Sequence, residues 1–179
     1  MQSKPYASLV GSLMYATICT RPDIAFIVGL MGRFQANLGE VHWISAKKVL
    51  RYLQRTKNFM LVYGKSETLE LKGYTDSDLA SDVDDRKSTC GYIFMLNGGA
   101  ISWKSAKQTV IATSTIEAEF VACFEGMKQV VWLKNFVSDL KVVSSIQKSV
   151  RMFCANNSAV FFAKNNKRTF ASVDGCKVP

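Results

Sequence analysis

Two acidic motifs in this chain have the residue types and spacing of a metal site. Asp76 and Asp78 are separated by one residue on a predicted strand, so both carboxylates point to the same face. Two such carboxylates repel each other, which is tolerable at a strand end in water or beside a cation. The third acidic residue is Glu119, near the start of a predicted helix. Together these residues predict a site for a divalent cation, because carboxylate oxygens are ligands that magnesium prefers.

Glu119 lies on the side of its helix that should pack against the rest of the protein. The helix is predicted to begin with a capping box, in which Ser114 is the N-cap and Glu117 bonds back to the N-cap amide. Glu119 then lies about 200° around the helix from Glu117, on the apolar side. Burying a glutamate is costly unless it is paired or ligates a metal, which favours a present or former metal ligand. The alternative is a partly exposed carboxylate that the helix dipole favours.

A calcium-binding loop is a rival interpretation of the first acidic motif, which opens as such a loop does. Ser81 stands where that loop needs glycine, and Lys87 stands where it needs a bidentate glutamate. The calcium-loop interpretation is therefore rejected.

The first third of the chain has helical periodicity, from residue 7 to about residue 55. Pro22 is placed near the start of a second helix, where its missing N–H has no cost. A third helix is predicted over residues 42–54, with Lys47, Lys48 and Arg51 together on its polar face. This basic face is either solvated surface or a stripe that binds phosphates. His42, the single histidine, is interpreted as structural or surface-facing.

The periodicity changes to that of strands after residue 64. Strands are predicted at residues 69–78, 90–96 and 100–103, the last two joined by a hairpin at Asn97-Gly98-Gly99. Residues 109–113 form a further β-branched run. A long helix at 115–139, a strand through Phe153 and a helix at 157–164 follow. This order of elements, three antiparallel strands followed by a helix, a strand and a helix, predicts a mixed α/β sheet.

Composition places the chain among globular proteins with an anionic partner. Its 179 residues are 48% hydrophobic and 21% charged, which predicts one domain with a core and a smaller appendage. A net charge of +9 favours nucleic acid first and an anionic membrane second. No stretch is apolar enough to span a bilayer, and no signal-peptide core follows the N-terminus. The five cysteines are scattered, which favours a reducing compartment, cytoplasmic or nuclear.

Several motifs resemble one known family along most of the chain, from about Tyr6 to Thr169. The motifs that carry the resemblance are Leu9-Val10-Gly11-Ser12-Leu13-Met14-Tyr15, Thr20-Arg21-Pro22-Asp23-Ile24, His42-Trp43, Gly73-Tyr74-Thr75-Asp76-Ser77-Asp78, Asp84-Asp85-Arg86-Lys87-Ser88-Thr89, Ile101-Ser102-Trp103-Lys104-Ser105, Glu117-Ala118-Glu119-Phe120 and the segment 154–163. With these motifs the sequence is similar to the ribonuclease H domain of copia-type retrotransposon polyproteins, preceded by the end of their reverse transcriptase.

The resemblance implies a ribonuclease H-like mixed sheet that lacks its last strand and helices and is preceded by a small helical segment. It assigns residues 1–62 to helices of the reverse transcriptase thumb or connection and residues 63–169 to the ribonuclease H-like domain. Residues 170–179 form a divergent tail that is expected to be flexible. Members of the family cleave the RNA strand of RNA–DNA hybrids with two magnesium ions that four carboxylates hold.

Carried over by motif, the resemblance makes Asp76 and Glu119 the first two metal-binding and catalytic carboxylates, with Asp78 as an additional candidate. The third carboxylate position falls on Ala155, and the fourth belongs to a segment that this chain does not match. Asp174 is too poorly positioned to replace the fourth. Magnesium or manganese is therefore expected to bind weakly or not at all. The strand through Phe153 is expected to become a sheet edge, open to self-association or a host protein, unless the tail or another chain covers it.

The resulting prediction is an inactive or severely impaired ribonuclease H-like domain that still binds RNA–DNA hybrid or another nucleic acid. Two alternatives stay open: a residual metal-dependent endoribonuclease, and a host protein-interaction module without a nucleic-acid role. No membrane partner is expected. The candidate nucleic-acid contacts are Lys47, Lys48, Arg51, Arg86, Lys87, Lys104, Lys107 and Ser114.

Overall fold

The computed structural model describes residues 4–65, 70–82, 84–140, 150–165 and 176–177. The chain divides into two compact units, Met1–Leu61 and Val62–Pro179. Each unit has a hydrophobic core of its own. Within the described residues, no helix has the length and apolar character needed to cross a membrane. The assignment of the first unit to a reverse transcriptase thumb or connection stays a prediction.

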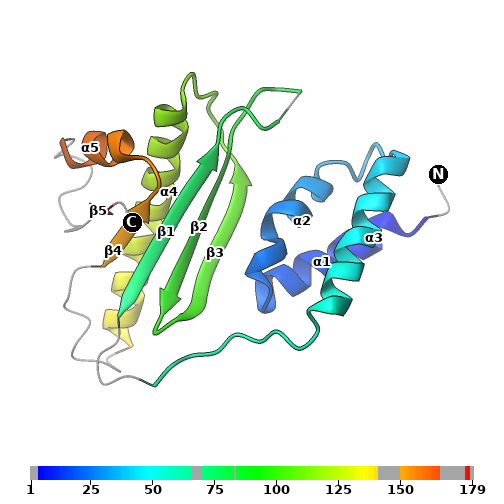
Figure 1. Ribbon diagram of the computed structural model, residues 1–179, viewed down its shortest axis with the longest axis horizontal. Coiled ribbons are helices and arrows are strands. Elements are labelled where there is room, and N and C mark those ends of the chain that lie inside the picture. Colours follow the sequence, from blue (N-terminus) through cyan, green and yellow to red (C-terminus); the bar gives the residue numbers. More distant parts are fainter. Residues whose placement is uncertain (1–3, 66–69, 83, 141–149, 166–175, 178–179) are drawn as a thin grey trace. The chain divides into compact units, whose positions relative to one another are not determined.

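The first unit consists of α1 (Tyr6–Cys19), the 3-10 turn η1 (Pro22–Ile24), α2 (Ala25–Gly32) and α3 (Glu40–Arg55) (Figure 1). Its core forms where apolar residues recur at helical spacing on all three α-helices. The hydroxyl of Tyr6 donates a hydrogen bond of 3.0 Å to the carbonyl of Met31 and so ties α1 to α2. The buried residues are Tyr6, Val10, Leu13, Ile24, Val28, Met31, Ala46 and Val49.

Polar contacts fix both ends of α3. At its start, Nδ1 of His42 accepts a 2.9 Å hydrogen bond from the amide of Gly39, so the helix begins two residues earlier than predicted. This contact confirms the structural role expected for His42. At the other end, Arg21 donates to Asp23 at 2.7 Å and to Thr56 at 2.6 Å. The turn before α2 is thereby held against the end of α3.

The second unit is built on a mixed sheet in the order β3-β2-β1-β4-β5 (Figure 1). Its strands are β1 (Leu71–Asp78), β2 (Thr89–Leu96), β3 (Gly99–Lys107), β4 (Arg151–Cys154) and β5 (Cys176–Lys177). β1, β2 and β3 pair antiparallel, whereas β4 runs parallel to β1 and to β5. The predicted mixed α/β sheet is confirmed, and its order is that of a partial ribonuclease H-like fold.

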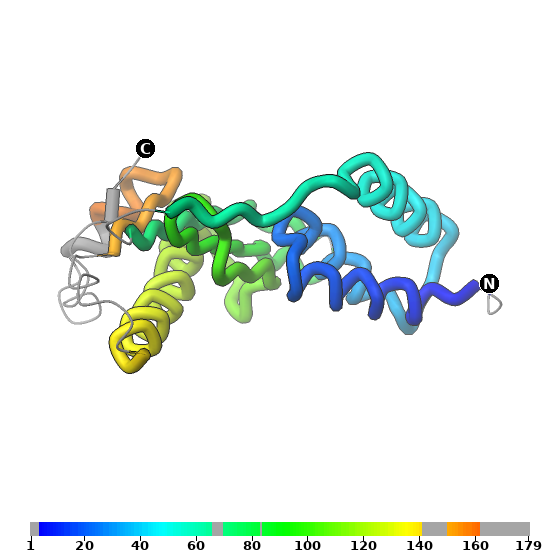
Figure 2. The backbone as a smooth tube through the Cα atoms, turned by 90° about the horizontal axis from the view of Figure 1, so that it is seen from below, coloured from blue at the N-terminus to red at the C-terminus, as the bar shows by residue number. Residues whose placement is uncertain are grey.

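One face of this sheet is covered by the long helix α4 (Thr115–Asp139), and α5 (Asn157–Asn165) packs against α4. Figure 2 shows α4, in yellow-green, running beside the strands. Two glycines make room for side chains in this core: Gly73 lets the Phe94 ring of β2 lie over β1, and Gly126 lets α4 approach β1. A Cβ at Gly73 would collide with the ring of Phe94, and one at Gly126 would lie 2.5 Å from Cγ2 of Thr75. The core between the layers includes Leu71, Phe94, Cys123, Met127, Val130, Leu133, Met152 and Cys154.

Three details differ from the sequence-based expectations. β3 extends to Lys107, and the β-branched run 109–113 forms no strand. There the amide of Gln108 donates to Ser88 at 2.8 Å and its side chain donates to the carbonyl of Ala118 at 2.9 Å, which turns the chain out of the sheet. β4 is not an exposed edge, because β5 pairs with Met152 and Phe153. Asp174 and the tail residues 170–175 and 178–179 lie outside the described residues.

Candidate functional site

Asp76 and Asp78 lie at the end of β1, where the strand reaches solvent. Both side chains are exposed. Oδ1 of Asp76 accepts a 3.0 Å hydrogen bond from the amide of Ser77. Oδ1 of Asp78 accepts a 2.9 Å hydrogen bond from the amide of Thr89, its partner on β2. Asp78 therefore closes the β1–β2 ladder, and Asp76 is the carboxylate of this pair that remains available near Glu119.

Glu119 lies one residue beyond the first turn of α4 and faces the sheet, as predicted from its position on the apolar side of the helix. Its side chain is only 7% exposed. The thiol of Cys154 on β4 donates a hydrogen bond of 3.6 Å to its Oε2. Burial, then the negative charge of an ionised Cys154, then that of Asp76, raise the pKa of Glu119 to about 8. Hydrogen bonding, first of all to Cys123, lowers the pKa of Cys154 to about 6, so the two buried groups titrate as a coupled pair.

Ala155 follows β4 directly and lies beside Asp76. In the parallel register Thr75 is opposite Cys154, so the next residues of the two strands, Asp76 and Ala155, are neighbours. The methyl group of Ala155 supplies no ligand oxygen. The next side chain, that of Asn156, caps α5: its Oδ1 accepts hydrogen bonds from the amides of Ser158 and Ala159, at 2.9 and 3.2 Å. The corner of the site next to Asp76 is therefore apolar.

The ligand set around Asp76 and Glu119 does not fit two magnesium ions. Among the described residues, no group of three or more His, Cys, Asp or Glu side chains could hold a metal ion. Two-ion phosphoryl transfer needs carboxylates that reach both ions, which two residues do not provide. We therefore derive no catalytic step through a metal at this position.

Two residues near Glu119 were missed by the sequence reasoning. Ser77 has a buried Oγ with no hydrogen-bond partner among the described residues, and Cys154 contacts the glutamate directly. Strand alternation could have identified Ser77, because it shares the α4 side of β1 with Thr75. The glutamate is thus held by the backbone of Ser77 and by the Cys154 sulfur, a weak partner for a carboxylate.

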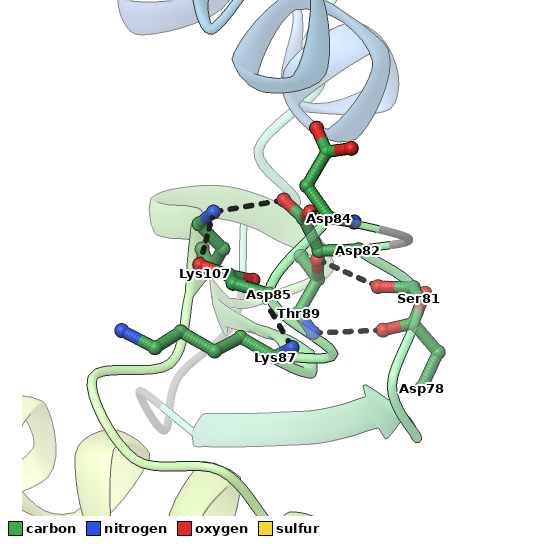
Figure 3. Close-up of polar contacts among 8 residues, drawn as sticks. All are labelled: Asp78, Ser81, Asp82, Asp84, Asp85, Lys87, Thr89 and Lys107. Carbon is green, nitrogen blue, oxygen red and sulfur yellow. Dashed lines mark hydrogen bonds and ion pairs between the residues drawn. The ribbon is translucent and has the colours of Figure 1, made fainter.

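Asp82 and Asp85 in the β1–β2 loop form a second acidic group, and Lys107 pairs with both of them (Figure 3). Nζ of Lys107 lies 2.8 Å from Oδ2 of Asp82 and 2.8 Å from Oδ2 of Asp85. The hydrogen bond from Lys107 lowers the pKa of Asp82 to about 2. Oδ1 of Asp82 also accepts from the amide of Asp84 at 3.1 Å. Lys107, a predicted nucleic-acid contact, is therefore engaged in holding this loop to β3.

The other predicted nucleic-acid contacts fall in both units. Lys47, Lys48 and Arg51 are exposed on α3 in the first unit, and the predicted grouping on one helix is confirmed. In the second unit, Arg86 and Lys87 lie in the β1–β2 loop and Lys104 on β3, with Arg86 and Lys104 exposed.

Ser114 is the N-cap of α4, as predicted. Its hydroxyl accepts from the amide of Glu117 at 3.2 Å. The return bond differs from the expectation, because the carboxylate of Glu117 accepts from the amide and hydroxyl of Thr113, at 2.7 and 2.8 Å. The extended backbone at Ser114 places the Thr113 amide, rather than that of Ser114, within reach of Glu117.

Comparison with known proteins identifies relatives of two kinds. Over 93% of its length the chain is 48% identical to the retrovirus-related Pol polyprotein from transposon TNT 1-94 of Nicotiana tabacum, of which it covers 12%. Over 89% of its length it is 34% identical to the Pol polyprotein from transposon RE2 of Arabidopsis thaliana, of which it covers 11%. Over 74% of its length it is 45% identical to secreted RxLR effector protein 161 of Plasmopara viticola, of which it covers 94%.

No protein-family model and no solved structure matches the chain. It spans a small part of each polyprotein and nearly all of the effector. The chain belongs to the family of copia-type retrotransposon Pol polyproteins, and it is homologous to one region of them.

Proposed function

We propose that this chain is a ribonuclease H-like domain that binds nucleic acid but no longer cleaves it. The ancestral reaction in this proposal is hydrolysis of the RNA strand of an RNA–DNA hybrid with divalent metal. The proposal rests on the membership of the polyprotein family and on the sheet order around β1 and β4. It concerns this region alone, since the polyproteins are several times longer.

The observation that carries the loss of catalysis is the pairing of β1 with β4. The pairing of Thr75 with Cys154 supports a position for Ala155 next to Asp76, where the family resemblance expects a carboxylate. Glu119 is hydrogen-bonded to Cys154 and to the backbone of Ser77. One buried glutamate and one exposed aspartate supply too few oxygens for two hard cations. Any residual endoribonuclease activity would depend on these two carboxylates.

A cleavage assay on a fluorescent RNA–DNA hybrid tests the catalytic part of the proposal. We expect the chain, in magnesium or manganese, to cleave no faster than its Asp76→Asn variant. The matched variant separates contamination from activity, because a contaminating nuclease would not respond to the substitution. Cleavage by the parent chain that disappears in Asp76→Asn would contradict the proposed loss of activity.

The binding part of the proposal is supported by the net charge of +9 and by the exposed cations of α3. Lys107 is left out, because Asp82 and Asp85 already neutralise it. We expect the hybrid to bind at low salt and to dissociate steeply as salt rises, because each neutralised phosphate releases counterions.

Fluorescence anisotropy measures this binding. The double variant Lys47→Gln and Lys48→Gln should weaken it, whereas the double variant Lys128→Gln and Lys134→Gln, at two exposed lysines of α4, is the matched charge control. Binding that is absent at low salt, or equally affected by both variants, would overturn the assignment to α3.

A second candidate function is supported by the Plasmopara relative, of which the chain covers 94% and whose printed name is that of a secreted effector. A region that exists in a relative as nearly a whole protein is compatible with a role as a protein-interaction module. Affinity capture with and without nuclease treatment tests this role. Partners that survive nuclease treatment would favour the interaction module over nucleic-acid binding.

A further inference from the structure

The two faces of the sheet differ sharply in what covers them. On the α4 face, Thr75, Phe94 and Met152 are buried. On the opposite face, the row that pairs Phe153, Tyr74, Ile93 and Trp103 contains no buried residue, and in the row of Lys72 the described residue Ala100 on β3 is buried. Tyr74 is 39% exposed there. This second surface, which we term the open face, carries Lys72, Tyr74, Ile93, Met95, Trp103, Arg151 and Phe153.

A row of three aromatic side chains and one isoleucine crosses the open face. The strand register aligns Phe153 with Tyr74, Tyr74 with Ile93, and Ile93 with Trp103. The rings of Tyr74 and Phe153 are stacked, with centroids 5.0 Å apart and planes 18° apart. Neighbouring strands lie about 4.8 Å apart, so the row from β4 to β3 spans roughly 14 Å.

Basic side chains flank this row on one side. Arg151 and Lys72 are neighbours in the next row of the sheet. Lys65 lines, with Lys72 and Tyr74, a cleft of about 450 Å³. Among the described residues, the carboxylate of Glu70 lies near them, 3.0 Å from Lys72 and 3.7 Å from Arg151. Of the described side chains, three cations and one carboxylate therefore give this half of the open face a positive charge.

The opposite end of the open face is acidic. Asp76 and Asp78 lie on the same side of β1, beyond the aromatic row. The charge therefore changes sign along β1, from Lys72 to Asp78. A polyanion would be attracted to the Lys72 end and repelled from the Asp78 end.

We propose that the open face binds single-stranded nucleic acid, with bases stacked on the row from Phe153 to Trp103 and phosphates near Lys65, Lys72 and Arg151. Aromatic side chains on a sheet face stack two or three bases in established RNA-binding modules. Base stacking together with a basic border is the combination that binds single strands without sequence preference. This site differs from the α3 surface of the proposed function and does not depend on it.

An apolar protein segment suits this surface less well. A docking helix or sheet buries a continuous apolar face, whereas here the aromatic row is bordered by Lys72 and Arg151 on one side and Asp76 on the other. Burying those charges against an apolar partner would be costly. A nucleotide chain instead offers a flat base to the rings and a phosphate to the cations.

Fluorescence anisotropy with a labelled oligothymidylate of about 12 nucleotides tests the proposal, since single-strand sites commonly cover ~4–16 nucleotides. Tyr74→Ala should weaken binding between about 5-fold and 100-fold, the loss of one base stack. Tyr74→Phe keeps the ring and should bind as the parent does. The matched control is Trp132→Ala, which removes an exposed ring stacked on Phe136 of α4.

A second pair of variants tests the charges. Lys72→Gln should weaken binding and reduce its salt dependence by about 0.7 in the log–log slope, the loss of one phosphate contact. Lys128→Gln is the matched control, because Lys128 also pairs with one glutamate, at 2.6 Å, but lies on α4. Equal effects of the sheet and α4 variants, or no binding by the parent chain, would overturn the proposal.

Photo-cross-linking on the unmodified chain keeps the test independent of variant folding. An oligothymidylate that contains 4-thiothymidine should cross-link to peptides from β1, β3 or β4. Cross-links confined to α3 or α4 would contradict the open face as the site. Light scattering distinguishes a protein occupant: a parent chain that is dimeric without nucleic acid, and a Tyr74→Ala variant that is monomeric, would show that the face joins two copies instead.

Discussion

Two acidic groups in the second unit have opposite electrostatic environments. In the β1–β2 loop, Asp82 and Asp85 share Lys107, and the pKa of Asp82 falls to about 2. Between α4 and β4, Glu119 is buried next to a thiol, and its pKa rises to about 8. The first group holds a loop in place. The second places a carboxyl where it destabilises the folded protein, which is typical of a functional position rather than a structural one.

Replacing Glu119 by glutamine should produce the largest effect. The folded pKa of about 8 lies above the ordinary value of 4.5, so unfolding releases a proton between these pH values. Stability contributed by the protonated form is complete below pH 4.5 and is lost as pH rises through 8. Glu119→Gln should therefore raise the free energy of unfolding by roughly 2–4 kcal/mol at pH 8 and by almost nothing at pH 4.

Urea unfolding in EDTA at several pH values measures this effect. Glu117→Gln is the matched control, because Glu117 is two residues away but accepts hydrogen bonds from Thr113 that lower its pKa. Its replacement should destabilise the protein at pH 8. If Glu119→Gln were less stable than the parent at pH 8, the buried carboxyl would not be destabilising. The proposed difference between Glu119 and the Asp82–Asp85 group would then be wrong.

Removing Lys107 should be the next largest effect, and of opposite sign. Lys107→Met leaves Asp82 and Asp85 without their cation, which should lower the Tm by several degrees at pH 7. The folded pKa of Asp82 lies below the ordinary 3.8, so its contribution is present above 3.8 and is lost as pH falls through about 2.

Thermal melts of Lys107→Met and the parent should therefore converge as pH falls from 4 towards 2. Lys104→Met, an exposed lysine on the same strand, should change Tm less. Equal Tm losses in the two variants would show that the Lys107 contacts add nothing to the loop.

The Ala155→Asp variant tests whether an added carboxylate lets the Glu119 site hold a cation, as Asp82 holds Lys107. A carboxylate beside Asp76 should create a weak cation site, so that magnesium raises the Tm of the variant but not of the parent. Metal at ten times its Kd would add about 1.4 kcal/mol. Ala155→Asn is the control, because it adds a polar side chain without charge. A magnesium response in the parent chain would contradict the incomplete ligand set.

The smallest expected effect is that of Asp76→Asn on Glu119. Asp76 contributes less to the raised pKa than burial and Cys154 do. Its removal should lower the Glu119 pKa slightly and increase stability at pH 8 by less than about 1 kcal/mol. Carbon NMR titration of the Glu119 carboxyl measures the change directly. An unchanged titration would show that Asp76 is electrostatically separate from Glu119.

The fold could be predicted where local signals and packing agree. The long helix was placed correctly at both ends, because Ser114 caps it and apolar residues repeat along it. β3 was predicted too short, since Lys104 and Lys107 carry no strand signal on an edge strand that faces solvent. The run 109–113 has strand propensity but no neighbouring strand, since the chain must leave the sheet to enter α4.

The candidate site was predictable in its residues and less so in their surroundings. Alternation and helical spacing placed Asp76 and Glu119. The contact of Cys154 with Glu119 depends on parallel pairing of strands about 80 residues apart, which no local pattern encodes. The sharing of Lys107 by two aspartates likewise depends on how the loop folds back on β3.

Gly73, which lies beneath the Phe94 ring, offers a test of which selective constraint, on the fold or on the chemistry, still acts on this sequence. Drift in an unselected copy would replace Gly73 as readily as any exposed residue, and the resulting side chain would collide with Phe94. A copy that must still fold would keep Gly73 while positions such as Ala155 vary. Comparing substitution rates at these two codons among sister copies would therefore separate selection for the fold from selection for the chemistry.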